Sequence, residues 1–164
     1  MKILVTGNMG YIGSALTEIL YDTYPSVKII GYDTGFFKHS FNKKFLNADK
    51  VDLQYYGDIR DISMSHLENV DSIVHLAAVS NDPIGNDFEY VTSEINHKAS
   101  IRLVKMAIKA RVKSFIFASS CSIYGFAGKN IKTEKDRINP LTIYAKSKIY
   151  IENYLKKNSD TNFR

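Results

Sequence analysis

The fold is decided by the stretch Lys2-Ile3-Leu4-Val5-Thr6-Gly7-Asn8-Met9-Gly10-Tyr11-Ile12-Gly13. Its apolar first half predicts a buried strand over residues 2–6, and a helix is expected over residues 11–21. In such a turn, Gly7 permits the sharp bend, Gly10 lets the backbone approach a pyrophosphate, and Gly13 allows helix and strand to pack closely. The helix N-terminus adds free N–H groups and a positive dipole end. The stretch therefore predicts a dinucleotide site, although a glycine turn that only packs a helix on a strand is an alternative.

An acidic residue, Asp33, follows the glycine turn at the distance that a ribose contact requires. It lies 20 residues beyond Gly13, at the end of a second predicted strand over residues 27–33. A carboxylate at this strand end accepts hydrogen bonds from both hydroxyls of an adenosine ribose, and it repels a 2′-phosphate. These features favour NAD over NADP as the cofactor. The alternative for Asp33 is a solvated strand-end acid with no ligand.

Short apolar runs alternate with helical periodicity along the chain. The pattern predicts strands at residues 2–6, 27–33, 53–57, 71–77 and 114–119, and helices at 11–21, 88–110 and 140–157. Short strands that alternate with helices form a parallel sheet covered on both faces, and right-handed crossovers make that sheet doubly wound. We therefore predict an α/β Rossmann fold flanked by helices, with residues 1–164 as one domain.

Composition and charge narrow the class of protein. The chain has 22 Lys and Arg residues against 17 Asp and Glu residues, but the basic residues are scattered and form no stripe with interleaved aromatics. This distribution argues against a nucleic-acid partner, and the net charge of +5 suits an anionic small substrate. Because no apolar run approaches the ~20 residues of a membrane helix, we expect no membrane partner.

The cysteine and histidine residues suggest neither a disulfide nor a metal site. Cys121 is the single cysteine and cannot form an internal disulfide, which favours a reducing compartment, the cytoplasm. We expect it to be a small buried residue rather than a nucleophile. His39, His66 and His97 show no metal-ligand spacing, so no metal is predicted. His75 lies in a predicted strand and is expected to pack or hydrogen-bond locally.

Two polar patterns in the second half of the chain suggest chemistry. Tyr144 and Lys148 are four residues apart, so a helix places them on one face, where an ammonium stabilises a phenolate and lowers the phenol pKa from about 10. Such a tyrosine can accept a proton from a hydroxyl group while hydride leaves the carbon that bears it. A chance pairing on an amphipathic helix has the same spacing. Ser119, Ser120 and Ser122 follow the fifth predicted strand, where a serine can hydrogen-bond the reacting hydroxyl.

Five motifs occur in a fixed order along the chain. They are Thr6-Gly7-x-x-Gly10-Tyr11-Ile12-Gly13, Gly57-Asp58-Ile59-Arg60-Asp61, His75-Leu76-Ala77-Ala78, Ser119-Ser120-x-x-Ile123-Tyr124-Gly125 and Tyr144-x-x-x-Lys148. Together they resemble the extended short-chain dehydrogenase/reductase family, in particular its NAD-dependent sugar-nucleotide epimerases and dehydratases of the UDP-galactose 4-epimerase type. The resemblance covers essentially the whole chain.

The resemblance implies a set of residues around NAD. They are Gly7, Gly10, Tyr11, Ile12 and Gly13 at the pyrophosphate, Asp33 at the adenosine ribose, Asp58 and Ile59 at the adenine, and Ala77, Ala78, Ser80, Tyr144 and Lys148 on the nicotinamide side. In addition, Asn96 occupies a mid-helix position that family members use to brace the active site.

The resemblance also implies the catalytic roles. Ser120, four residues before Tyr124, matches the catalytic Ser or Thr in preference to the neighbouring serines. Tyr144 is the general base, and Lys148 holds the nicotinamide ribose while tuning Tyr144. The implied reaction oxidises a hydroxyl of a nucleotide-sugar substrate by hydride transfer to NAD, and the keto intermediate is then epimerised, dehydrated or reduced. The alternative is an NAD-binding module without turnover, a sensor or scaffold.

Family members are about twice as long as this chain, so we expect it to be a fragment without the C-terminal substrate-binding lobe. Residues 161–164 look like the start of a sixth strand. Relatives pair two long helices across a homodimer, so the predicted helices at 88–110 and 140–157 are expected to form a dimer interface. The loop at 80–85 departs from the commonest family sequence and is expected near the substrate, whereas the aromatic loop at 36–45 predicts no function.

Overall fold

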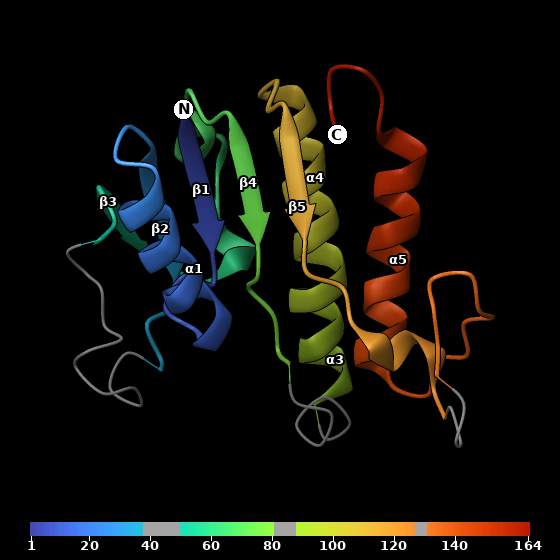
Figure 1. Cartoon of the computed structure of the whole chain (residues 1–164). Helices are drawn as coiled ribbons and strands as arrows, with labels where there is room; N and C mark the ends of the chain where they lie inside the picture. Colours follow the sequence, from blue (N-terminus) through green and yellow to red (C-terminus); the bar gives the residue numbers. More distant parts are fainter. Residues whose placement is uncertain (38–49, 81–87, 127–130) are drawn as a thin grey trace.

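The strands of the computed structural model, which describes residues 1–37, 50–80, 88–126 and 131–164, form one parallel sheet (Figure 1). They are β1 (Lys2–Thr6), β2 (Lys28–Asp33), β3 (Leu53–Tyr56), β4 (Ser72–His75) and β5 (Ser114–Phe117). Their order across the sheet is β3-β2-β1-β4-β5. This doubly wound order confirms the predicted Rossmann fold.

The strand order reverses beside β1, because the chain returns from β3 across the sheet to β4. Strand β1 pairs in parallel with β2 on one side and with β4 on the other, so that Thr6 lies opposite both Tyr32 and His75. The carboxyl ends of all five strands therefore meet at one edge, where open α/β sheets bind their ligands. The glycine turn, Asp33 and the serines after β5 all lie at this edge, as the sequence predicted.

Helices cover both faces of the sheet (Figure 1). They are the α-helices α1 (Tyr11–Thr23), α3 (Glu89–Thr92), α4 (Ser100–Lys109) and α5 (Ile143–Asn158), the π-helical segment η5 (Ser93–Ala99), and the 3₁₀ turns η3 (Ile59–Asp61), η4 (Met64–Leu67) and η6 (Cys121–Tyr124). Helix α1 packs against one face, and α4 and α5 pack against the other.

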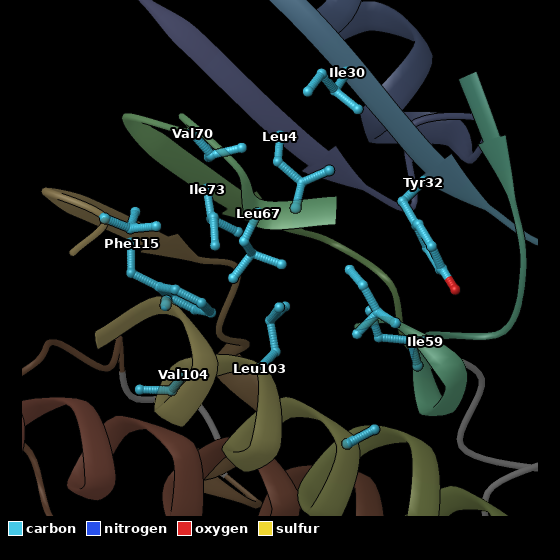
Figure 2. Close-up of a cluster of buried hydrophobic side chains, with 14 of the residues drawn as sticks. Leu4, Ile30, Tyr32, Ile59, Leu67, Val70, Ile73, Leu103, Val104 and Phe115 are labelled. Carbon is cyan, nitrogen blue, oxygen red and sulfur yellow. The ribbon is translucent and has the colours of Figure 1, made fainter. Parts of the chain in front are cut away.

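The side chains of β1 alternate between these two helical layers, as expected for a strand that is covered on both faces. Ile3 and Val5 belong to a cluster on the α1 side, where Leu16 packs against them. Leu4 points the other way, into the larger cluster that includes Leu103 of α4 (Figure 2). The larger cluster fixes the helical layer that carries the second half of the site.

Leu103 provides a test of this packing, because its side chain is 0% exposed. We expect Leu103→Ala to lower the free energy of unfolding by about 2–5 kcal/mol, since it removes buried methylenes and leaves a cavity. Ile108→Ala is the matched control on the same helix, where Ile108 is 38% exposed, and it should cost much less. Urea unfolding of both variants measures the difference, and equal losses would contradict the packing of α4 against the sheet.

The helix predicted over residues 88–110 is present, but its middle segment is π-helical. Segment η5 joins α3 to α4 with a wider turn than an α-helix has, a feature often found at functional sites. It contains Asn96, whose side chain hydrogen-bonds the main chain after β4. The spacing of apolar residues does not distinguish seven π-helical residues from an α-helix, so the sequence predicted a continuous helix.

Two boundaries near the end of the chain differ from their predictions. Helix α5 begins later than expected, because the Thr142 hydroxyl accepts a hydrogen bond from Ala145 N at 3.1 Å and caps the helix there. Residues 161–164, all of them described, form no strand. However, Phe115 N of β5 donates to Arg164 O at 2.7 Å, so the end of the chain does run beside β5.

Parts of two sequence predictions lie outside the described residues. These parts are residues 81–85 of the loop expected near the substrate and residues 38–45 of the aromatic loop, which includes His39. Within the described residues, no helix combines the length and the apolar content that crossing a membrane requires.

Candidate cofactor and active site

Two glycines in the turn between β1 and α1 are required by close backbone contacts. Gly7 has a φ of +76°, in the left-handed region that favours glycine, and a Cβ on it would lie 2.7 Å from Ala77 N. A Cβ on Gly13 would collide with the carbonyl oxygen of Gly7. The start of α1 therefore packs directly against the turn, which is the geometry that the glycine spacing predicted.

Gly10 leaves open space at the start of α1. A Cβ on Gly10 would make only an ordinary contact, 3.4 Å from Gly7 O. Among the described residues no side chain caps α1, and Tyr11 and Ile12 in its first turn are 82% and 61% exposed. The first-turn N–H groups and the positive end of the helix dipole therefore face an open side, where a pyrophosphate fits.

Asp33 lies beside the glycine turn at the end of β2. Its Oδ2 accepts a hydrogen bond from Met9 N at 3.0 Å, and its Oδ1 accepts one from Gly35 N at 2.8 Å. Each carboxylate oxygen has a second acceptor site. The carboxylate is therefore fixed relative to the turn and still fits a pair of ribose hydroxyls. The contact with Met9 was not part of the sequence prediction.

A pair of side-chain amides supports the glycine turn. Asn8 Nδ2 donates to Gln54 Oε1 at 2.7 Å, and Gln54 Nε2 donates back to Asn8 Oδ1 at 3.3 Å. The Asn8 amide packs so closely on β2 that a Cβ on Gly31 would collide with it. Sequence reasoning missed both amides, because 46 positions separate them and no local pattern links them.

The turn after β3 carries the residues implied at the adenine. The Asp58 carboxylate accepts hydrogen bonds from Arg60 N at 2.8 Å and from its guanidinium at 2.7 Å, which hold the pKa of Asp58 below its ordinary value. The Tyr32 hydroxyl donates to Asp58 O at 3.0 Å and ties this turn to β2. Ile59 is 5% exposed, and its side chain belongs to the larger core cluster.

The segment after β4 is held against η5 by Asn96, which is 2% exposed. Val79 N donates to Asn96 Oδ1, and Asn96 Nδ2 donates to Val79 O, both at 2.8 Å. This double contact fixes the segment that contains Ala77 and Ala78. Because Ala77 N lies against Gly7, the residues implied on the nicotinamide side adjoin the glycine turn. Ser80 is exposed at the end of this segment.

His75 links three elements at the buried end of β4. Its Nδ1 lies 2.7 Å from Thr6 Oγ1 of β1, and its Nε2 lies 2.7 Å from Ser100 Oγ of α4. Burial lowers the pKa of His75 to about 3, and the charge of Lys148 contributes, so the ring is neutral. This geometry confirms the predicted local hydrogen bonding. The described residues contain no group of three potential metal ligands.

Helix α5 presents Tyr144 and Lys148 at the predicted i, i+4 spacing. Lys148 Nζ lies 5.2 Å from the centre of the Tyr144 ring and 4.7 Å from that of Phe117. It donates a hydrogen bond of 2.6 Å to Ala118 O, directly after β5. Lys148 is 4% exposed, and burial lowers its pKa to about 8. The structure therefore brings α5 and the end of β5 together around a buried amine whose pKa lies below the ordinary value for lysine.

The three serines after β5 have different partners. Ser120 Oγ accepts hydrogen bonds from Ser122 N at 3.2 Å and from Ser122 Oγ at 2.9 Å, so it caps η6 and can still donate its own proton. The Ser119 hydroxyl instead donates to the Glu152 carboxylate of α5. These partners favour Ser120 over its neighbours as the donor to a substrate hydroxyl. Glu152 was not singled out from the sequence.

The prediction that Cys121 is buried is wrong. Cys121 is exposed at the first position of η6. In this single 3₁₀ turn, Ile123 is the residue that packs inward, at 6% exposed. The exposure of Cys121 therefore follows from its position on the turn and not from the apolar character of its side chain.

The fold and the site together define the class of protein. A sheet of this order with a glycine turn beside a strand-end carboxylate has the architecture of a nucleotide-binding domain, and Lys148 and Tyr144 belong to a motif that resembles the short-chain dehydrogenase/reductase family. Residues 3–163 match the model of the NAD dependent epimerase/dehydratase family, and the chain belongs to that family. NAD is the cofactor of the family, as the sequence predicted.

Relatives include epimerases and dehydratases of nucleotide sugars. The UDP-glucose 4-epimerase of Yersinia enterocolitica is 31% identical over 95% of this chain and 48% of its own length. The UDP-N-acetylglucosamine 4-epimerase from Methanobrevibacter ruminantium M1 has a TM-score of 0.83 at 28% identity, over 95% of this chain and 49% of that one. DesIV, the dTDP-glucose 4,6-dehydratase from Streptomyces venezuelae solved with NAD, has a TM-score of 0.82 at 29% identity, over 96% and 51%. The chain thus spans about half the length of the relatives that it matches.

Proposed function

We propose that this chain is the cofactor-binding and catalytic part of an NAD-dependent nucleotide-sugar epimerase or dehydratase, with residues 1–164 as its NAD-binding domain. The observation that carries the proposal is the buried Lys148 amine, which lies beside the Tyr144 ring and is hydrogen-bonded to Ala118 O, two residues before Ser120. A domain that only binds NAD has no need of a tyrosine, a buried lysine and a serine turn at one sheet edge. This arrangement favours an enzyme over a sensor or scaffold.

The residues at the sheet edge fit NAD along their length. The open side of Gly10 and the uncapped start of α1 suit the pyrophosphate, and the oxygens of Asp33 suit the ribose hydroxyls. Lys148 and the segment that Asn96 holds after β4 suit the nicotinamide half. When bound, NAD supplies the acceptor for the hydride that leaves the substrate carbon.

The residues of the chain itself move the proton. Tyr144 accepts the proton of the sugar hydroxyl at its phenolic oxygen, and the positive charge of Lys148 stabilises the phenolate that does so. Ser120 hydrogen-bonds the reacting oxygen and shares the proton with Tyr144. The hydroxyl oxygen loses its proton and the carbon that bears it loses hydride, which converts the alcohol into a ketone. The ketone is then epimerised, dehydrated or reduced.

Two measurements test the proposal in order. In thermal unfolding, NAD⁺ should stabilise the chain by about 2.7 kcal/mol at a hundredfold excess over Kd, and NADP⁺ should stabilise it less because Asp33 repels the 2′-phosphate. The NAD⁺-loaded chain is then incubated with UDP-glucose or UDP-N-acetylglucosamine, and the products are separated by anion-exchange chromatography. Stabilisation without any product would show that residues 1–164 bind NAD⁺ without turning over these two substrates, which favours a binding module. No stabilisation by either dinucleotide would overturn the cofactor site.

Two alanine variants of the glycine turn separate cofactor binding from packing. Gly10→Ala should weaken NAD⁺ binding by about tenfold with the fold intact, since its Cβ points to the open side where the pyrophosphate approaches. Gly13→Ala should also lower the free energy of unfolding, by roughly 1–3 kcal/mol, because its Cβ collides with Gly7 O. Calorimetric titration and unfolding without NAD⁺ measure the two effects. Wild-type NAD⁺ affinity in Gly10→Ala would contradict this pyrophosphate site.

We also propose a cytoplasmic homodimer that associates through the helical regions 88–110 and 140–157. Phe88, Tyr90 and Tyr150 in these regions are 60%, 74% and 53% exposed, and aromatic side chains of this kind are enriched at interfaces. The His97 and Tyr150 rings stack with their centres 4.7 Å apart, which joins the two helical regions within one chain. The small-molecule partner in this proposal is a nucleotide sugar.

A further inference from the structure

Helix α5 contacts the segment before η6 at two successive residues. Tyr144, Lys148 and Glu152 follow one another at intervals of four along α5 and therefore lie on one face of the helix. Lys148 Nζ donates to the main-chain oxygen of Ala118 at 2.6 Å. The next residue, Ser119, donates its hydroxyl to the Glu152 carboxylate. The main chain that leads into η6 is thus attached to the helix that carries Tyr144.

Each oxygen of the Glu152 carboxylate has one contact: Oε1 accepts from the Ser119 hydroxyl, and Oε2 pairs with Lys156. Its Oε2 lies 3.6 Å from Lys156 Nζ, and its side chain is 25% exposed. Burial raises the pKa of Tyr124 at the end of η6, and the negative charges of Glu134, Glu152 and Asp136 add to this effect. The negative charge of Glu152 therefore acts on Tyr124, at the end of the turn that follows Ser120.

From this geometry we propose that Glu152 is a positioning residue for Ser120. It acts through Ser119: the hydrogen bond fixes the chain one residue before Ser120 and so fixes the Ser120 hydroxyl relative to Tyr144. A displacement of about 1 Å at a reacting group is enough to cost roughly 10²-fold in rate, so such a contact matters for catalysis. The inference rests on the proposed function, which assigns the roles of Ser120 and Tyr144.

The competing explanation is that Glu152 only stabilises α5 through its i, i+4 ion pair with Lys156. Four single variants separate the two explanations. Ser119→Ala removes the hydrogen bond alone, and Lys156→Gln removes the ion pair alone. Glu152→Ala removes both contacts, whereas Glu152→Gln keeps an oxygen that can accept from Ser119.

Steady-state kinetics with NAD⁺ and the nucleotide sugar give the first readout. We expect kcat to fall about tenfold in Ser119→Ala and in Glu152→Ala, with KM and NAD⁺ affinity unchanged, because the contact orients the serine without touching either ligand. The Ser119→Ala/Glu152→Ala double variant should have a kcat no lower than that of either single variant. Glu152→Gln should keep most of the activity, and Lys156→Gln should keep all of it. Full activity in Ser119→Ala, or a tenfold loss in Lys156→Gln, would overturn the inference.

Cys121 gives a second readout that needs no turnover. It is the single cysteine, it is exposed, and it adjoins Ser120, so a trifluoromethyl label on its thiol reports on η6 by ¹⁹F NMR. The signal should shift or broaden in Ser119→Ala and Glu152→Ala and should match the wild type in Lys156→Gln. An unchanged signal in Glu152→Ala would overturn the inference. If the ¹⁹F signal changes in Ser119→Ala and Glu152→Ala but the wild type shows no turnover, the result would count against the proposed function and not against the contact between Glu152 and Ser119.

Discussion

Replacing Tyr144 by phenylalanine is expected to lower kcat by about 10²–10⁴-fold, the range that general acid–base catalysis contributes. The change removes the phenolic oxygen that accepts the proton of the sugar hydroxyl. It keeps the ring beside Lys148, whose Nζ lies 5.2 Å from the ring centre. Since the packing is retained, NAD⁺ affinity and Tm should change little by comparison. Steady-state kinetics and calorimetric titration with NAD⁺ on the same preparation test both expectations.

Tyr154→Phe is the matched control for this experiment. Tyr154 lies on the same helix as Tyr144 and packs against the larger core cluster, away from the Lys148 contact described above. Loss of its hydroxyl should leave kcat near the wild-type value. Wild-type turnover in Tyr144→Phe would show that another group takes the proton. Equal losses in the two variants would point to a general effect of disturbing α5.

The sheet was largely predictable from local sequence. Strand β1 occupies residues 2–6, as expected, because an apolar run that ends in a glycine turn has few other folded forms. The doubly wound topology, although not the exact order of the strands, was expected from right-handed crossovers between parallel strands. The π-helical turn around Asn96 was not predictable, since apolar spacing over seven residues is compatible with both helix types. The exposure of Cys121 depends on which side of a single turn packs inward, and composition does not specify that side.

The candidate site was predictable as a set of motifs, but its supporting contacts were not. Asp33 was expected near the glycine turn, yet its bond to Met9 N joins residues 24 positions apart. The contact between Ser119 and Glu152 spans 33 positions and depends on how α5 lies against the end of β5. For Glu152, the sequence contains one usable signal, its place four residues after Lys148 on the same helical face. Such a signal marks a face of the helix and does not identify the partner.

The free energy of unfolding should rise by roughly 3 kcal/mol between pH 8 and pH 10.5 through Lys148 alone. Burial lowers the pKa of Lys148 to about 8 in the folded chain, against 10.5 as its ordinary value in an unfolded chain. Below pH 8 both states carry the proton, so the folded state bears the full cost of burying a charge. Between the two pKa values the unfolded state binds more protons, and stability therefore increases with pH.

Lys148→Met isolates this effect, because methionine fills similar space without a charge. The variant should be more stable than the wild type near pH 7, and its advantage should shrink by roughly 3 kcal/mol as the pH rises from 8 to 10.5. Urea unfolding of both proteins across this range measures the difference and cancels the titration of the other groups. A constant difference would mean that the pKa of Lys148 is the same in the folded and unfolded states.

Turnover should respond to pH in the opposite direction. Deprotonation of Lys148 removes the cost of burying its charge, but it also removes the positive charge that stabilises the Tyr144 phenolate. We therefore expect kcat to fall as the pH rises through about 8. A kcat that stays constant would mean that Lys148 acts through its hydrogen bond to Ala118 O, which a neutral amine can still donate. Opposite trends in stability and turnover, measured on one protein, would show that the fold tolerates a buried charge because the reaction uses it.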